Sequence, residues 1–418
     1  MHPFTVLFLI AFSFISVSAL APPYKYKTLV APIVKDPKTS LYSITLNSRE
    51  NYVIDINAPL SWRLCPPGYP PYPVSCYAPQ CIQARSFLSS MCPPADNVWM
   101  KYGQCQCVVT PVNPVAKSCV PERLTYGNFN LSWTNGKNPT GVAKLNKIYY
   151  SCASKALFKS LPQGASGLAA LSRAPLAFSS QLTPSNLGVA KKFAICLPST
   201  NKAPGVTFFG DGPYNFEHYI PAQLDASKIL SYTPLVKKSN SAEYYIGVKG
   251  ISINEKASKF SPNAFAFDSN GNGGVKLSTL VPYTVLRSDI YKTLLNDFSK
   301  ATKNIPRAKT VSPFGLCMKA SALGWSRVGL MAPTIEFELG NGAKWYMIGA
   351  HSMKVVGNDV ACLAFVDGGK TAKEAVVIGS YQLEDNLLQF DLAASRLGFG
   401  SLTARRSSCT YFNFTSTV

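Results

Sequence analysis

Val53-Ile54-Asp55-Ile56-Asn57, followed by Trp62 and Cys65, is the stretch of this chain that says most about its fold. Tyr52 to Ile56 is a compact apolar run, as expected of a buried strand, interrupted by a single carboxylate. Trp62 lies seven residues after Asp55, and Cys65 lies ten residues after it. If the fold is duplicated, a second strand of this kind is expected in the other half of the chain.

Strand patterns dominate the chain and fall into two halves. Leu41 to Leu46 alternates apolar and polar residues, and the alternation returns from Tyr244 to Ile253. The segment from Ser231 to Ala242, polar in its middle, separates the halves. The clearest helix is expected from Arg287 to Phe298, behind the start signal Ser288-Asp289. Because 418 residues exceed one ordinary core, we expect an all-β-dominated, bilobal fold with few short helices.

The second half carries a matching stretch from Gly274 to Leu286, followed by Ile290-Tyr291. The two stretches resemble the active-site strands of plant pepsin-like aspartic proteases, in which apolar residues precede Asp-Thr-Gly. In that family the second catalytic Asp lies thirteen residues before the Tyr, and here that position is Ser278. The resemblance implies a pepsin-like fold in which Asp55 and Ser278 are the remnants of the catalytic pair.

Further stretches extend the resemblance over most of residues 25–418. The chain ends with CTYFNFTS at residues 409–416, which points to one non-catalytic branch of the family: xyloglucan-endoglucanase inhibitor proteins, extracellular dermal glycoproteins and basic seed globulins, with cereal xylanase inhibitors more distant. The other matching stretches are GLAALSRAPLAFSSQL (167–182), KFAIC (192–196), FFGDGPY (208–214) and VVIGSYQLEDNLLQFDLAASRLGFG (376–400).

The resemblance also implies a domain plan. Residues 1–19 are expected to be a signal peptide, and residues 20–230 an N-terminal lobe of the xylanase-inhibitor N-terminal type. Residues 231–418 are expected to form a C-terminal lobe of the xylanase-inhibitor C-terminal type. Residues 65–121 are rich in Pro and hold seven of the twelve cysteines, so we expect a disulfide-stapled loop insertion there rather than a packed sheet.

Peptide cleavage is not expected of this chain. Aspartic proteolysis needs two carboxylates about 3 Å apart that share one proton, and Ser278 cannot ionise at useful pH. The glycines that follow the catalytic Asp residues in the family are replaced by Asn57 and Leu280, where the family's backbone arrangement needs a small residue. We therefore expect a pseudo-aspartic peptidase that is not an enzyme.

Asp268-Ser269-Asn270 resembles the family's second motif but lies at the wrong place. Asp268 precedes Tyr291 by twenty-three residues instead of thirteen. It is followed by Asn270-Gly271-Asn272-Gly273-Gly274, a composition typical of a turn between strands. Asp268 is therefore not expected to replace the missing carboxylate.

The first residues favour secretion. An apolar run from Pro3 to Val17 precedes Ser18-Ala19, where small residues suit cleavage by signal peptidase. No later segment is long and apolar enough to span a membrane. Because a secreted chain passes through the compartment where glycans are added, Asn130-Leu131-Ser132 and Asn413-Phe414-Thr415 are expected to be glycosylation sequons.

The cysteines are expected to form six disulfides in that compartment. Beyond the leader only His218 and His351 remain as imidazole ligands, so neither a metal nor another cofactor is expected. The counts alone leave the connectivity open; the resemblance implies only the pair Cys317 with Cys362. The cysteines are Cys65, Cys76, Cys81, Cys92, Cys105, Cys107, Cys119, Cys152, Cys196, Cys317, Cys362 and Cys409.

The chain is strongly basic, with 41 Lys and Arg against 21 Asp and Glu and a net charge of +20. These charges are spread as single residues and short pairs, which does not favour a nucleic-acid partner. An acidic cell-wall polysaccharide or an acidic protein is the expected counter-charge, or the charge is a solvated surface without a partner. A monomer is expected.

The branch resemblance implies a binding function: inhibition of microbial cell-wall glycoside hydrolases, endoglucanase or xylanase, in plant defence. Endoglucanase-inhibiting relatives carry an Arg in the segment Ser-Thr-Arg-Val-Gly, and Arg327 occupies that position here. They carry a second Arg after Val-Asp-Gly-Gly, where this chain has Lys370 and Lys373. The substrate clefts of glycoside hydrolases hold two carboxylates, to which the side chain of an Arg or Lys would bind. The alternative that Arg327 only caps a backbone segment or forms a salt bridge within its own lobe stays open.

Two other functions stay open. The chain would need only its basicity and glycosylation to be a wall-associated or storage globulin with lectin character and no inhibitory activity. A residual aspartic endopeptidase is the third possibility, and it would depend on Asp55. The target enzyme or sugar ligand is not determined by the sequence.

Overall fold

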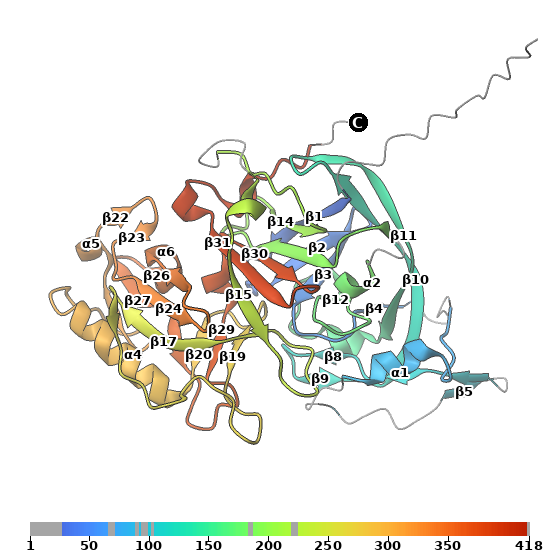
Figure 1. Cartoon of the computed structure of the whole chain (residues 1–418), viewed down its shortest axis with the longest axis horizontal. Coiled ribbons are helices and arrows are strands. Elements are labelled where there is room, and N and C mark those ends of the chain that lie inside the picture. The colour runs from blue at the N-terminus through green and yellow to red at the C-terminus, as the bar shows by residue number, and fades with distance from the viewer. Residues whose placement is uncertain are drawn as a thin grey trace, which may run out of the picture.

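The computed structural model describes residues 27–65, 72–87, 92, 99–101, 104–182, 187–218 and 225–415. Figure 1 shows two β-rich lobes, the N-terminal one coloured blue to green and the C-terminal one orange, with strands from both halves between them. The bilobal all-β expectation is confirmed. The expected signal peptide at residues 1–19 lies outside the described residues.

The N-terminal half is built almost entirely from strands. Its helical pieces are short: α1 (Pro79–Arg85), η1 (Lys155–Phe158), α2 (Phe178–Gln181) and η2 (Ala226–Ile229). The strands are β1 (Thr28–Lys35), β2 (Tyr42–Leu46), β3 (Glu50–Asp55), β4 (Trp62–Leu64), β5 (Trp99–Lys101), β6 (Gln104–Gln106), β7 (Val108–Val109), β8 (Val112–Asn113), β9 (Ser118–Cys119), β10 (Glu122–Thr134), β11 (Pro139–Ala153), β12 (Ala165–Ala170), β13 (Lys192–Cys196) and β14 (Gly205–Phe209).

The C-terminal half repeats this composition and adds one long helix. Its strands are β15 (Ser231–Val236), β16 (Tyr245–Ile246), β17 (Val248–Ile253), β18 (Lys256–Ala257), β19 (Val275–Leu277), β20 (Thr284–Leu286), β21 (Cys317–Lys319), β22 (Trp325–Ser326), β23 (Gly329–Leu330), β24 (Ile335–Leu339), β25 (Lys344–Met347), β26 (Met353–Gly357), β27 (Val360–Leu363), β28 (Phe365–Asp367), β29 (Val376–Ile378), β30 (Asn386–Asp391) and β31 (Arg396–Ser401). The helices are α4 (Ser288–Ala301), α5 (Ala320–Leu323), α6 (Gly349–Ser352), α7 (Ser380–Leu383), η3 (Thr403–Arg405) and η4 (Cys409–Tyr411).

A six-stranded antiparallel sheet joins the halves in the order β1-β14-β13-β30-β31-β15. Three of its strands come from each half, and the lobes meet where β13 pairs with β30. Phe193 of β13 stacks on Phe390 of β30 with ring centroids 4.7 Å apart, and both rings are fully buried. Continuous apolar runs form these inner strands because both faces of the sheet are covered.

The predicted helix is confirmed with a small shift of its ends. It runs from Ser288 to Ala301, with Ile290, Leu294 and Phe298 buried as the spacing indicated. No described helix is long and apolar enough to cross a membrane.

The stapled insertion contains more regular structure than expected. The helix α1 and the short strands β5 to β9 all lie within residues 65–121, so the expectation of a loop region alone was wrong. Disulfides Cys76–Cys105 and Cys81–Cys107 hold these pieces together. Because covalent links replace a large apolar core there, strands of two or three residues persist that pattern analysis does not detect.

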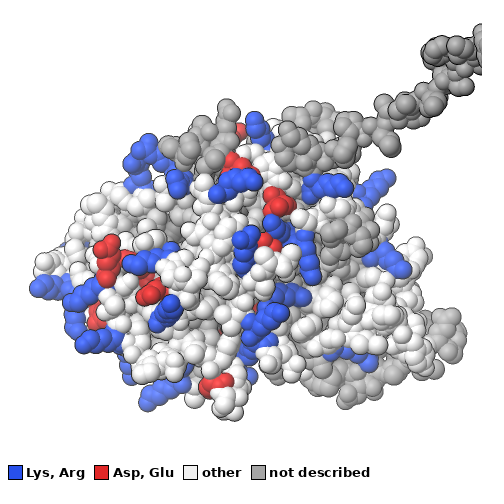
Figure 2. Space-filling model, in the orientation of Figure 1, with Lys and Arg blue, Asp and Glu red and all other residues white. Residues whose placement is uncertain are grey.

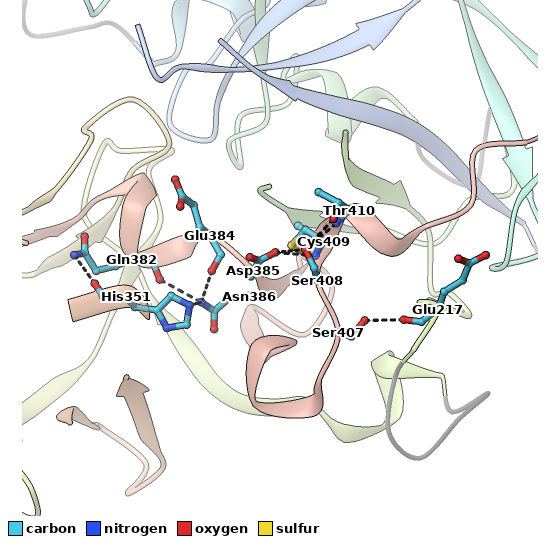
Figure 3. The surroundings of a disulfide bond; sticks show 11 residues. Glu217, His351, Gln382, Glu384, Asp385, Asn386, Ser407, Ser408, Cys409 and Thr410 are labelled. Carbon is cyan, nitrogen blue, oxygen red and sulfur yellow. Dashed lines mark hydrogen bonds between the residues drawn. A yellow bond between two sulfur atoms is a disulfide. The ribbon is translucent and has the colours of Figure 1, made fainter. Parts of the chain in front are cut away.

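All twelve cysteines are paired, which confirms the six disulfides, and the expected pair Cys317–Cys362 is among them. The pair Cys196–Cys409 connects β13 of the central sheet to η4 near the C-terminus (Figure 3). Asp385 supports the same place, because its carboxylate accepts hydrogen bonds from the Ser408 hydroxyl and the Cys409 amide, each at 2.8 Å. The other pairs are Cys65–Cys152 and Cys92–Cys119.

The sequence separation between paired cysteines predicts their contributions to stability. Cys196 and Cys409 are 213 residues apart, whereas Cys76 and Cys105 are 29 apart. By loop closure in the unfolded chain, the long link contributes about 5.4 kcal/mol and the short one about 3.6 kcal/mol. We therefore expect Cys196→Ala/Cys409→Ala to lower the free energy of unfolding in guanidinium by about 1.8 kcal/mol more than Cys76→Ala/Cys105→Ala does. An equal or smaller loss would contradict the loop-closure explanation.

Candidate functional site

The strand registers relate Asp55 to Ser278. In the N-terminal lobe, Leu168 of β12 pairs with Val53 of β3 and with Trp62 of β4. In the C-terminal lobe, Val377 of β29 pairs with Lys276 of β19 in parallel and with Val285 of β20 in antiparallel, as Leu168 does with Val53 and Trp62. Val53 and Trp62 are nine residues apart, and so are Lys276 and Val285. Val53 therefore corresponds to Lys276. Two residues further along, Asp55 corresponds to Ser278.

Backbone amides that follow in the chain donate hydrogen bonds to the side chains of both Asp55 and Ser278. The amide of Asn57 donates to the Asp55 carboxylate at 2.8 Å. On the other side, the amides of Leu280 and Val281 donate to the Ser278 hydroxyl oxygen at 3.2 and 3.1 Å. Both residues are buried, at 4% and 5% exposure. The turn after each strand is therefore retained, while only one of the two positions carries an acid.

Thr279 connects the two turns across the lobe boundary. Its hydroxyl donates to the Ile54 carbonyl at 2.7 Å and accepts a long hydrogen bond from the Ile56 amide at 3.5 Å. The corresponding residue in the N-terminal lobe is Ile56, which has no hydroxyl to return these bonds. The sequence analysis did not predict a role for Thr279, although this residue directly follows Ser278.

Asn57 adds a second connection between the lobes. Its side-chain amide donates to the Leu277 carbonyl at 2.8 Å, and its side-chain oxygen accepts from the Tyr244 amide at 3.3 Å. The expectation that residue 57 must be small was wrong, because the Asn side chain bonds the opposite lobe instead of disturbing it. Asn57 and Thr279 together hold the two remnant turns against each other.

Asp55 lies in an environment that disfavours its charge. Burial raises its pKa to about 6, against opposing hydrogen bonds from the amides of Asn57 and Ala58. Lys276 also favours the charged form, whereas Glu243 disfavours it. A single acid with a serine opposite has no second carboxylate with which to divide the roles of acid and base.

Lys276 is committed to a cluster beside this turn. Its ammonium group lies 3.0 Å from Glu243 and 3.4 Å from Glu374. The Tyr245 hydroxyl donates to Glu243 at 2.8 Å. Burial opposes the charge of Lys276, but the two carboxylates outweigh it and raise its pKa. The cluster thus holds β16 and β19 to the loop before β29, and Lys276 is paired with these two carboxylates.

Asp268 lies in an exposed turn, away from the remnant pair. Its carboxylate accepts hydrogen bonds from the amides of Asn270 and Asn272, each at 2.8 Å. Phe267 bridges to Gly273 across the turn. The interpretation of this segment as a turn between strands is confirmed.

Arg327 lies at the tip of the β22–β23 hairpin and is exposed. The Ser326 hydroxyl donates to the Gly329 carbonyl at 2.9 Å, and the Ala350 amide of α6 donates to the Val328 carbonyl at 3.0 Å. Gly329 has φ +94°, and a Cβ there would lie 2.5 Å from the Ala350 amide nitrogen, so only glycine fits. The hairpin is thus held rigidly against α6.

No ion pair joins Arg327 to any residue that the structure describes. The internal salt bridge that the sequence left open for this residue is therefore not seen within the described ranges. Two large apolar side chains flank it on the same hairpin, Trp325 at 65% exposure and Met331 at 60%.

Lys370 and Lys373 lie on a different loop, between β28 and β29, and both are exposed. The Lys373 carbonyl accepts from the Gly273 amide at 2.6 Å, and the Gly369 carbonyl accepts from the Ser288 amide at the start of α4 at 3.2 Å. In Figure 1 the β22–β23 hairpin lies at the upper left of the lobe and β29 well below it. The structure does not bring these lysines together with Arg327.

The remaining predicted sites lie at the surface or in the interior as their types suggest. Asn130 and Asn413 of the two sequons are exposed, which leaves their amides accessible. His351 is buried at 2% exposure, and burial lowers its pKa to about 4. In the described part of the chain, no group of three or more His, Cys, Asp or Glu side chains is placed to hold a metal ion.

The raised pKa of Asp55 predicts a pH-dependent cost. A group whose folded pKa lies above its unfolded value of 3.8 stabilises the fold below that value, and this contribution is lost as the pH rises through about 6. A rise of about two pKa units corresponds to about 3 kcal/mol. We expect Asp55→Asn to raise the free energy of unfolding relative to wild type at pH 7.5 and to change it little at pH 3.5. Denaturant titrations at both pH values measure this, and a larger gain at pH 3.5 would contradict it.

The bonds of Asn57 predict a loss of stability without it. Asn57→Ala leaves the Leu277 carbonyl and the Tyr244 amide without these partners, which costs about 2 kcal/mol. Asn270→Ala, at an exposed turn position, is the matched control and is expected to change stability by less than about 0.5 kcal/mol. Thermal unfolding of the two variants and wild type measures the difference; equal melting temperatures would contradict the bridging role.

Comparisons with known proteins cover nearly the whole chain. Residues 41–211 match the family model described as xylanase inhibitor N-terminal, and residues 243–401 match the one described as xylanase inhibitor C-terminal. A probable aspartic proteinase GIP2 from Nicotiana benthamiana is 35% identical over 94% of this chain and 93% of its own.

Solved structures agree with these matches. The crystal structure of edgp superposes with a TM-score of 0.85 at 35% identity, covering 95% of this chain and all of that one. Conglutin gamma, a basic 7S globulin from lupine seeds, superposes with a TM-score of 0.77 at 28% identity, covering 93% and 99%. The chain therefore belongs to the xylanase-inhibitor family of pepsin-fold proteins.

Proposed function

We propose that this chain is a secreted, non-catalytic protein that inhibits microbial cell-wall glycoside hydrolases by inserting Arg327 into their substrate cleft. The observation that carries the proposal is the state of Arg327: exposed, at the tip of a rigid hairpin, and without an ion-pair partner among the described residues. Its guanidinium is therefore available to form ion pairs with another protein.

The chemistry of the target suits this hairpin. The active clefts of glycoside hydrolases carry two carboxylates that flank the scissile bond. A guanidinium binds a carboxylate through two parallel, charge-assisted hydrogen bonds. Trp325 at the start of this hairpin and Met331 directly after it are also exposed, and Trp, Met and Arg are enriched at protein interfaces. Because the hairpin is already ordered, little conformational entropy is lost when it binds.

Lys370 and Lys373 are proposed as a second, weaker contact. Both are exposed on the loop before β29. An ammonium group supplies charge but not the planar fork of a guanidinium. We therefore assign most of the affinity to Arg327.

The charge of the molecule supports an acidic partner. Figure 2 shows Lys and Arg spread over the visible face, with few acidic side chains between them. A net charge of +20 accelerates association with a negatively charged protein and makes that rate sensitive to salt.

Secretion and the absence of proteolysis belong to the same proposal. Six disulfides are typical of an oxidising, extracellular compartment such as the apoplast or cell wall. Asp55 faces a retained turn that presents Ser278, so a residual aspartic endopeptidase has no second acid. We further propose a lobe boundary between residues 230 and 231 and a monomeric protein.

A basic globulin without inhibitory activity is the second candidate. The relative from lupine seeds bears that name, and the net charge alone would bind an acidic wall polysaccharide. This function requires nothing of Arg327.

Inhibition assays separate the two. Wild type and Arg327→Ala are tested against a panel of fungal endoglucanases and xylanases, with Arg406→Ala, another exposed arginine, as matched control. We expect the inhibition constant to rise at least about tenfold for Arg327→Ala, as for a central interface arginine, and to stay within about twofold for the control. Lys373→Ala is expected to give a smaller rise. Inhibition of no enzyme in the panel would reject the inhibitor and favour the globulin.

A further inference from the structure

Three tyrosines lie in a row across the strands on one side of the N-terminal lobe. Pro73 bridges antiparallel to Thr125, which places Tyr72 directly opposite Tyr126 of β10. Tyr126 is in turn paired with Tyr149 of β11. Figure 1 shows β10 and β11 along the outer side of this lobe. We refer to Tyr72, Tyr126 and Tyr149 as the tyrosine row; none of them belongs to the remnant pair or to the proposed inhibitory hairpin.

Backbone contacts hold the first member of the row beside β10. The Thr125 hydroxyl donates to the Tyr72 carbonyl at 2.9 Å, and the Val74 amide donates to the Leu124 carbonyl at 3.1 Å. The Val74 carbonyl accepts from the amide of Cys107, which belongs to a disulfide of the insertion. Because none of these contacts uses the phenol of a tyrosine, the row is expected to keep its register when a phenol is removed.

The rings of Tyr72 and Tyr126 are stacked. Their centroids are 5.0 Å apart and their planes differ by 12°, so the two rings are in offset-stacked contact. Two other tyrosine pairs are arranged differently: the planes of Tyr126 and Tyr149 cross at 60°, and so do those of Tyr283 and Tyr381. The parallel arrangement brings ring carbons of Tyr72 and Tyr126 close together, which is what a bond between two rings requires.

The stacked pair is accessible from solvent. Tyr72 is 56% exposed and Tyr126 is partly exposed. The ammonium group of Lys147 lies 5.4 Å from the centre of the Tyr126 ring, and a cation over a ring is attracted to its electrons. Removing an electron from Tyr126 is therefore harder than removing one from Tyr72, and oxidation is expected to begin at Tyr72.

We propose that Tyr72 and Tyr126 are a site of oxidative modification, at which a haem peroxidase and hydrogen peroxide couple the two phenols into a dityrosine. The six disulfides are typical of an oxidising compartment, in which such an oxidant acts. This modification is independent of hydrolase inhibition, since it uses no residue of the inhibitory hairpin.

The coupling takes two electrons from the pair. Each phenol gives up one electron and its phenolic proton, which yields two neutral phenoxyl radicals. The radicals combine in a carbon–carbon bond between ring positions next to the oxygens, and the hydrogen atoms on those two carbons move to the oxygens and restore both phenols. Hydrogen peroxide accepts the two electrons and two protons and leaves as two molecules of water. Unlike a disulfide, the new bond is not cleaved by thiols, so it would hold the insertion to β10 under reducing conditions.

Peptide mapping of the oxidised protein tests the site. The full, disulfide-bonded chain is treated with a haem peroxidase and hydrogen peroxide at low protein concentration, and the monomer is isolated by gel filtration. We expect the monomer to gain dityrosine fluorescence and to lose the mass of two hydrogen atoms. After reduction and proteolysis, a cross-linked peptide is expected to join Tyr72 to Tyr126.

Phenylalanine variants identify the coupled rings. Tyr72→Phe and Tyr126→Phe each keep the stack and remove one phenol, and both are expected to lose the dityrosine fluorescence of the monomer. Tyr77→Phe is the matched control, because Tyr77 is 85% exposed and lies outside the row. It is expected to couple as wild type does, and so is Tyr149→Phe, whose ring crosses that of Tyr126 at 60°.

The peptide map is read on wild type and does not depend on the folding of any variant. A wild-type monomer without dityrosine would overturn the proposal. Cross-links that form only between molecules, or a monomer cross-link that persists in Tyr72→Phe, would overturn it as well.

Discussion

The pairing of β13 with β30 is the interaction on which the rest of this structure depends. It joins two three-stranded sets into one sheet, so that each lobe is built outward from a shared hydrogen-bonded layer. The stacked rings of Phe193 and Phe390 lie at this joint. Cys196, at the end of β13, is linked to Cys409, which ties the end of the chain to the same layer. The relative position of the lobes follows from this sheet, and with it the contact between the turns that carry Asp55 and Ser278.

The turns that carry Asp55 and Ser278 keep the same backbone arrangement with different side chains. Ser278 receives the backbone amides that surround Asp55 in the other lobe, so the turn did not depend on the acid. Thr279 and Asn57 form hydrogen bonds that cross between the lobes, a buried one from Thr279 and a partly buried one from Asn57. These hydrogen bonds join the lobes at the two turns. The price is a buried acid at Asp55, whose pKa of about 6 marks a residue held for its place in the turn.

The proposed recognition site lies away from the remnant pair, on the β22–β23 hairpin. The hairpin that carries Arg327 is rigid because Gly329 allows close contact with α6, and its exposed Trp325 gives it the composition of an interface.

The sequence by itself determined the bilobal β fold, the number of disulfides but not their connectivity, the helix that follows Arg287, and the correspondence of Ser278 to Asp55. These follow from local patterns: strand alternation, helical spacing and fixed distances along the chain. The role of Asn57, the strands within residues 65–121 and the absence of a described ion pair at Arg327 were decided only by the tertiary structure. Each of them depends on which backbone and side-chain atoms from distant segments meet, and residue spacing carries no information about that.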